Sequence, residues 1–292
     1  MERPARHTGG AIALVVAVIV LVAGGGALWW VDARTRPDAV GKRIGAQIVD
    51  HHAGASVASL GRDMLRITMP SGVYIDARLA AAFDACGADR FGCSNAIDGV
   101  AADVAHVEAL LAKPRLADVR AMVIGESSPG FRFGYVTEPL IGPLEVRYAL
   151  VSDTAATFVT SALADRLGVD RAQLKRAALA NLAADGEPRA ELLGDRAGVY
   201  RVVSKDDAVA ELFDARRMKK LAALVGSTRL YCAIPARGVL LVARADAAGK
   251  RALTPLLARA NPHEMRPGDR ELLIYDTATL EAQALSIAEA GP

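Results

Sequence analysis

The stretch LYCAIPARGVLLVA, residues 230–243, indicates the fold class of this 292-residue chain. Two apolar runs, residues 230–234 and 239–243, flank the turn sequence Pro235-Ala236-Arg237-Gly238, and this pattern predicts a β-hairpin. A hairpin joins antiparallel strands, whereas parallel strands need a long crossover connection. Two further hairpins are expected, one from residues 65–69 and 73–76 and one from residues 190–193 and 198–203.

Helical patterns lie between these hairpins. Apolar residues three or four positions apart predict helices over residues 38–52, 94–111 and 170–183. We also expect helices over residues 78–85, 160–167, 206–225, 246–260 and 279–289, and single strands over residues 120–124, 144–151 and 271–276. Because helices and hairpins are interspersed and do not strictly alternate, the sequence predicts an α+β fold of antiparallel hairpins packed with helices.

The N-terminal region contains an uncharged run, AIALVVAVIVLVAGGGALWW, at residues 11–30. A helix of this length spans the roughly 30 Å hydrocarbon core of a bilayer, and the two closing tryptophans suit the headgroup level. We therefore expect a short tail, residues 1–10, and a transmembrane signal-anchor helix over residues 11–31. A cleaved signal peptide is the main alternative, because Arg3 and Arg6 precede the run and small residues at 24–27 could be cleaved. A buried core helix is a third interpretation, although such helices are rarely apolar on every face.

Two observations bear on the orientation of this anchor. Arg34, Arg36, Lys42 and Arg43 follow the run, and a count of basic residues would keep the body of the chain in the cytoplasm. Long domains, however, translocate largely regardless of charge. The count therefore leaves both orientations open.

The cysteines favour export. Cys86 and Cys93 bound the segment CGADRFGC, whose glycines let the chain turn back on itself, so we expect a disulfide, which requires an oxidising compartment. Two separate buried thiols are the alternative. Cys232 lies in an apolar run and is expected to be a buried, unpaired strand residue. We expect the main domain to be extracytoplasmic, held at the cytoplasmic membrane by a single span.

The composition and the motifs exclude several classes of function. The chain carries 35 basic and 33 acidic side chains and is 52% hydrophobic, which argues against intrinsic disorder and against a nucleic-acid partner. No HExxH, GxSxG or Walker pattern occurs, and three cysteines are too few for a tetrathiolate site. We therefore predict no catalytic, cofactor-binding or metal-ligating residue. The glycine-bearing loop at residues 125–134 is the best location for a ligand to meet backbone amides.

Two features of the predicted helices invite a functional interpretation. The cluster RRMKK contains Arg216, Arg217, Lys219 and Lys220, which could contact anionic lipid headgroups or could form a solvated helix face. Asn181 is unusual inside a helix, and its side chain either satisfies a buried backbone group or lines a pocket.

Four segments occur in the order found in one family. They are EVRYALV at residues 145–151, LKRAALANL at 174–182, FDARRM at 213–218 and YCAIPARGVLLVA at 231–243. Together they resemble the YtpQ family of bacterial proteins of unknown function, over roughly residues 140–245. In FDARRM, Arg216 replaces the serine of the family motif. The resemblance implies a fold and a bacterial origin, and it implies no catalytic residues.

These observations predict two regions after the anchor: an α+β subdomain with the cysteine loop at residues 32–118 and a YtpQ-like domain at residues 119–292. Our leading hypothesis is an anchored protein that binds an envelope protein or a small ligand without catalysing a reaction. One alternative is an envelope-associated hydrolase with an unrecognised site. The other is a cytoplasm-facing, membrane-tethered domain whose basic cluster lies on the inner leaflet.

Overall fold

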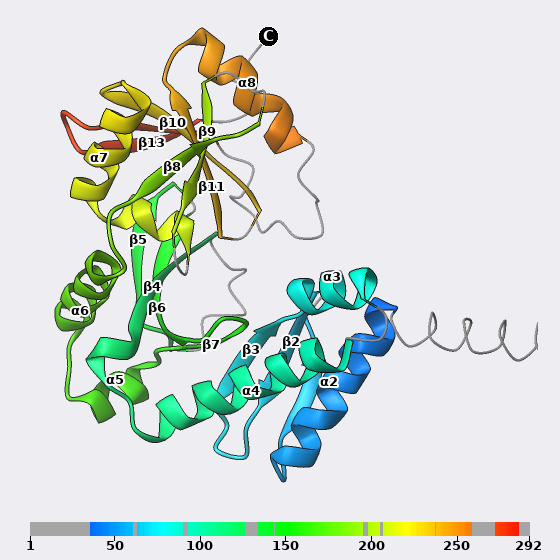
Figure 1. The fold of residues 1–292 in the computed structure, drawn as a ribbon. Helices are drawn as coiled ribbons and strands as arrows, with labels where there is room; N and C mark the ends of the chain where they lie inside the picture. The colour runs from blue at the N-terminus through cyan, green and yellow to red at the C-terminus, as the bar shows by residue number, and fades with distance from the viewer. Residues whose placement is uncertain are drawn as a thin grey trace, which may run out of the picture. The chain divides into compact units, whose positions relative to one another are not determined.

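The computed structural model describes residues 36–60, 63–89, 93–125, 134–142, 144–194, 198–204, 207–236, 238–258 and 272–285 (Figure 1). The chain forms two compact units, Met1–Gly72 with Asp76–Val104 and Val73–Ile75 with Ala105–Pro292, which we call unit 1 and unit 2. Within the described ranges, each strand pair with a defined register is antiparallel, so the predicted α+β class is confirmed.

The predicted anchor, residues 11–31, lies outside the described residues. None of the helices that the structure describes has both the length and the apolar composition of a membrane span.

Unit 1 combines helices with three strands. Its elements are α2 (Pro37–His51), β1 (Ser56–Ser59), β2 (Met64–Thr68), most of β3 (Tyr74–Arg78), α3 (Ala80–Ala88) and the first part of α4 (Cys93–Ala112), with the strands in the order β1-β2-β3. The predicted apolar stripe of α2 is confirmed, because Val40, Ile44 and Ile48 are all fully buried. Helix α4 begins at Cys93, one residue before the start expected from the sequence.

In unit 2, β6 (Leu144–Val151) pairs with three other strands. β4 (Val119–Gly125) follows one edge of β6, while β5 (Thr137–Ile141) and β7 (Ala155–Phe158) pair with successive parts of it. η1 (Leu116–Asp118) precedes β4, and α5 (Ser161–Leu167) and α6 (Arg171–Ala184) follow β7, with α6 packed against β4 (Figure 1). Asp170 begins α6 with a capping box, in which its carboxylate accepts from the Gln173 amide at 2.7 Å and Gln173 accepts from the Asp170 amide at 2.8 Å.

The second sheet of unit 2 has the order β13-β12-β10-β11-β9-β8. Its strands are β8 (Arg189–Leu192), β9 (Val199–Val203), β10 (Arg229–Ala236), β11 (Val239–Arg244), β12 (Leu272–Asp276) and β13 (Glu281–Leu285). One face buries Val199, Ala233 and Leu241 against Leu253 and Leu257 of α8 (Ala247–Ala258). The predicted hairpins at residues 190–203 and 230–243 are both confirmed.

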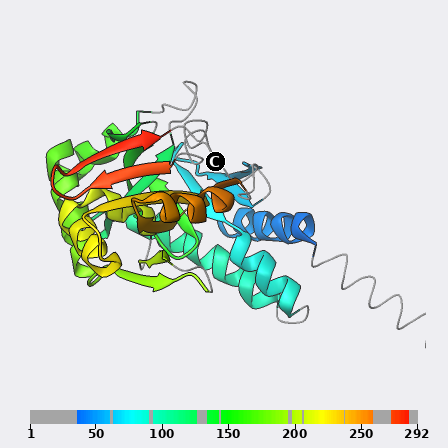
Figure 2. The same ribbon diagram turned by 90° about the horizontal axis from the view of Figure 1, so that it is seen from above.

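One helix prediction holds only in part, and another is wrong. The expected helix over residues 206–225 is split into η3 (Ala208–Phe213) and α7 (Ala215–Val225), because Asp214 adopts an extended backbone and its carboxylate caps α7 through the Arg216 amide at 2.8 Å. The expected helix over residues 279–289 contains β13 instead, which pairs with β12 from Asp276↔Glu281 to Leu272↔Leu285 (Figure 2, red end of the colour scale). Pairing with a neighbouring strand here outweighs the local helix preference of LEAQAL.

Candidate functional site

Three of the segments that carry the family resemblance meet in unit 2. Tyr148 comes from β6, Lys175 from α6 and Phe213 from the end of η3, and Glu138 of β5 lies among them. We call these four residues the Glu138 cluster. Their positions in the sequence are far apart, so only the pairing of β5 with β6 and the packing of α6 and η3 bring them together.

The carboxylate of Glu138 is the centre of the cluster. One of its oxygens, Oε1, accepts a hydrogen bond from the Tyr148 hydroxyl, and the other, Oε2, lies 2.9 Å from the Lys175 ammonium. That ammonium nitrogen also lies 4.9 Å from the centroid of the Phe213 ring, within the range of a cation–π contact. The Tyr148 and Phe213 rings meet edge to face, with centroids 6.4 Å apart.

These contacts fix the protonation states of the cluster. Burial alone would raise the pKa of Glu138, but the hydrogen bonds from Tyr148 and Lys175, with the charges of Lys175 and Arg171, bring it below its ordinary value. Burial raises the pKa of Tyr148 far above its ordinary value, and the hydrogen bond to Glu138 raises it further. At neutral pH Glu138 is therefore an anion and Tyr148 a neutral donor, so the cluster stabilises a positive charge.

The two partners of the ion pair differ in exposure. The Glu138 side chain is 14% exposed, whereas that of Lys175 is 44% exposed. Arg171 lies one turn before Lys175 on α6, is exposed, and acts electrostatically on both Glu138 and Tyr148. The carboxylate is thus a fixed part of the sheet, and the ammonium reaches it from the surface.

The opposite face of β6 carries a comparable but buried arrangement. Arg147 pairs with Glu145, and its guanidinium carbon lies 5.2 Å from the centroid of the Tyr135 ring and 5.5 Å from that of Phe158. Only 5% of Arg147 is exposed. This cation comes from the strand itself and holds the sheet together, so we regard it as structural.

The basic cluster at residues 216–220 is not a single exposed face. Arg217 is buried, where it donates to both oxygens of Glu211 at 2.5 and 2.8 Å and to the Gly186 carbonyl at 2.6 Å. Lys220 pairs with Glu187, and both side chains are exposed. The interpretation of the cluster as an anionic-surface contact is therefore wrong for Arg217, because its charge is neutralised inside the domain. It stays a prediction for the exposed residues Arg216, Lys219 and Lys220.

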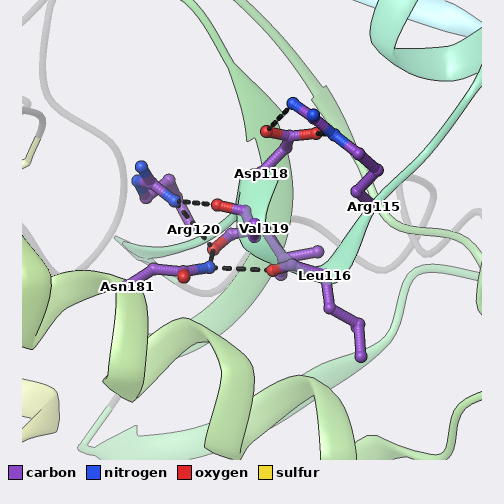
Figure 3. Close-up of polar contacts among 7 residues, drawn as sticks. Arg115, Leu116, Asp118, Val119, Arg120 and Asn181 are labelled. Carbon is purple, nitrogen blue, oxygen red and sulfur yellow. Dashed lines mark hydrogen bonds and ion pairs between the residues drawn. The ribbon is translucent and has the colours of Figure 1, made fainter.

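Asn181 satisfies backbone groups beside the start of β4 (Figure 3). Its Nδ2 donates to the carbonyl of Leu116 at 2.8 Å and to that of Val119 at 2.7 Å. Next to it Arg120 donates to the Ala117 carbonyl at 2.9 Å, and Arg115 pairs with Asp118. The structural interpretation of Asn181 is confirmed: its amide connects α6 to the first residue of η1 and the first residue of β4.

The cysteines behave as the sequence predicts. Cys86 near the end of α3 and Cys93 at the start of α4 are at disulfide-bonding distance, with Cα atoms 4.4 Å apart, and both are buried. Arg43 of α2 lies against this pair, with Nη1 3.9 Å from the Cys93 sulfur. Cys232 is fully buried in β10, and burial raises the pKa of its thiol to about 12. Cys232 is therefore an unreactive core residue at neutral pH.

The histidines and the glycine-bearing loop add no chemistry that the structure describes. His51 ends α2, with Nδ1 2.7 Å from the Gln47 carbonyl oxygen, and His106 is exposed on α4. Within the described ranges, no three His, Cys, Asp or Glu side chains are grouped as a metal site would need. His7, His263 and residues 126–133 of the loop lie outside the described residues.

Comparison of the chain with protein-family models, with curated proteins and with solved structures finds no match. The resemblance to the YtpQ family stays a prediction. The sequence did not predict the Glu138 cluster, because β5 is a short strand without a clear alternating pattern and nothing local to Glu138 marks it as buried.

Proposed function

We propose that this chain is a single-pass, membrane-anchored bacterial protein of the YtpQ type whose extracytoplasmic body binds a partner or ligand. The pairing of Cys86 with Cys93 carries this proposal, because a disulfide persists in an oxidising compartment and is rare in the cytosol. The uncharged run at residues 11–30 is long enough to serve as the anchor of this proposal.

A binding role fits the chemistry of the Glu138 cluster better than catalysis does. Its acidic group is held as an anion and its phenol as a neutral donor, so neither is poised to exchange a proton near neutral pH. The arrangement holds a cation in place, which is a recognition task. An envelope hydrolase would need a nucleophile and a base within hydrogen-bonding distance of each other. Among the residues that the structure describes, this cluster contains no such pair.

Cysteine accessibility in intact cells tests the location. Lys219 is exposed in unit 2, and Thr8 precedes the apolar run, so Lys219→Cys and Thr8→Cys report opposite sides of a single span. We expect a membrane-impermeant maleimide to label the Lys219→Cys chain in intact cells and the Thr8→Cys chain only after lysis. The native cysteines should not be labelled without reductant, because Cys86 and Cys93 are paired and Cys232 is buried.

The reverse labelling pattern would overturn this location. It would favour the cytoplasm-facing alternative, in which Arg216, Lys219 and Lys220 would face anionic headgroups of the inner leaflet. Loss of the Thr8→Cys label from mature protein, with a mass lower by the first thirty or so residues, would favour a cleaved signal peptide over an anchor.

A further inference from the structure

The two faces of β6 each hold a cation between a carboxylate and aromatic rings, but the two cations differ. Arg147 is buried, belongs to β6 itself and contacts two rings, so it has no route out of its site. Lys175 enters from α6, keeps 44% of its side chain exposed and contacts one ring. The first arrangement is part of the sheet, and the second can open by a change of one side-chain conformation.

The groups around the Lys175 nitrogen are those that recognise an ammonium ion. A carboxylate oxygen of Glu138 lies 2.9 Å away and supplies the charge, and the face of Phe213 lies 4.9 Å away and supplies a cation–π contact. Tyr148 donates a hydrogen bond to the other oxygen of Glu138, Oε1, so the carboxylate keeps its orientation when its ammonium partner changes. These three groups would make the same contacts with an ammonium ion that belongs to a separate molecule.

We propose that Glu138, Tyr148 and Phe213 form a binding site for the primary ammonium group of a small organic ligand, and that Lys175 is an internal ammonium which the ligand displaces. The inference rests on the proposed binding role and names its ligand class, and it does not depend on the membrane anchor. Displacement breaks one half-exposed ion pair and one cation–π contact, both of which are weak.

The surrounding charges also define which amines the site prefers. Arg171 lies one turn away on the same helix and acts on both Glu138 and Tyr148. A ligand with a second positive charge would meet Arg171 and the displaced Lys175, whereas a monoamine would not. The site should therefore prefer a singly charged amine.

Titration of the purified full-length chain with butylammonium chloride, followed by calorimetry at constant ionic strength, tests the proposal. Butylammonium reproduces the stem and head of the lysine side chain. We expect weak, saturable binding to the wild-type chain and at least tenfold tighter binding to Lys175→Ala, because the internal competitor is removed. 1,4-Diammoniobutane should bind Lys175→Ala more weakly than butylammonium, and 1-butanol should not bind.

Matched variants distinguish binding of the amine at this site from non-specific binding to the protein surface. Arg176→Ala removes the next cation on α6, which is exposed, and should leave the wild-type affinity unchanged. Lys175→Ala with Glu138→Gln should lose binding, and Lys175→Ala with Phe213→Leu should weaken it. Lys175→Met supports the same comparison if the alanine variant does not fold.

No saturable binding to the wild-type chain would overturn the proposal, as would equal affinities of the wild-type and Lys175→Ala chains, or binding that survives Glu138→Gln. The maleimide labelling tests only the location of the protein, and the amine titration tests only the binding site. Failure of either proposal therefore leaves the other unaffected.

Discussion

Breaking the Cys86–Cys93 bond should destabilise unit 1 by an amount that the loop length sets. The cysteines are seven positions apart, and the chain-entropy relation for a closed loop of this size gives about 2.4 kcal/mol at 25 °C. Both side chains are buried between α3 and α4, so the substitution Cys86→Ala with Cys93→Ala also loses some packing. Reduction of the wild-type chain removes the bond alone and isolates the entropic part.

The assay compares oxidised wild type, reduced wild type and the double alanine variant by urea denaturation, with native-state hydrogen exchange of α3 and α4 amides as a local readout. We expect reduced wild type to lose about 2 kcal/mol in the free energy of opening of unit 1. Amides of α6, in unit 2, should show no change and serve as an internal control. Equal exchange in α3 and α4 before and after reduction would refute the reasoning, because the bond would then constrain nothing in the unfolded chain.

Four further outcomes follow from contacts described above. Arg217→Met leaves the buried Glu211 carboxylate without its partner and should cost about 3–5 kcal/mol by thermal or urea denaturation, whereas Arg217→Met combined with Glu211→Leu should recover much of the loss. Asn181→Leu removes the donor to two carbonyls and should cost about 1–3 kcal/mol in the same assay; no change would mean that water replaces the amide. Cys232, with a pKa raised to about 12, should resist iodoacetamide at pH 8 in the folded chain and react after unfolding. The pKa of Glu138 is lowered in the folded chain, so this group stabilises the fold above its ordinary pKa, and that stabilisation is lost as the pH falls through the folded-state pKa. In Glu138→Gln, the free energy of unfolding should therefore fall less steeply with decreasing pH on the acid side.

The parts of the fold that the sequence could predict are those with local causes. Helix α2 follows from an apolar stripe four residues apart, α6 from Asp170 and Gln173 at its start, and the hairpins from turn residues between apolar runs. For Asn181 the sequence left open whether the side chain meets backbone groups or lines a pocket, and its contacts with the carbonyls of Leu116 and Val119 decide between the two.

The parts that could not be predicted depend on pairing between distant segments. β13 has a helical composition and becomes a strand because β12 lies beside it. β5 and β7 are short, and their places are set by β6, with which both pair. In the sequence, Arg217 is one of four neighbouring cations that suggest a surface patch. Only its contacts with Glu211 and Gly186 show that it is buried. The charge pattern of a sequence alone does not distinguish a buried cation from an exposed one.

The central position of β6 has a consequence for how the chain must fold. Arg147 and Tyr148 are neighbours in sequence, so they project to opposite faces of the sheet. A slip of one residue would move both side chains to the opposite faces, so Glu138 would lose its Tyr148 donor, and Tyr135 and Phe158 would lose the Arg147 guanidinium. The contacts on the two faces of β6 therefore disfavour a register of this strand that is shifted by one residue.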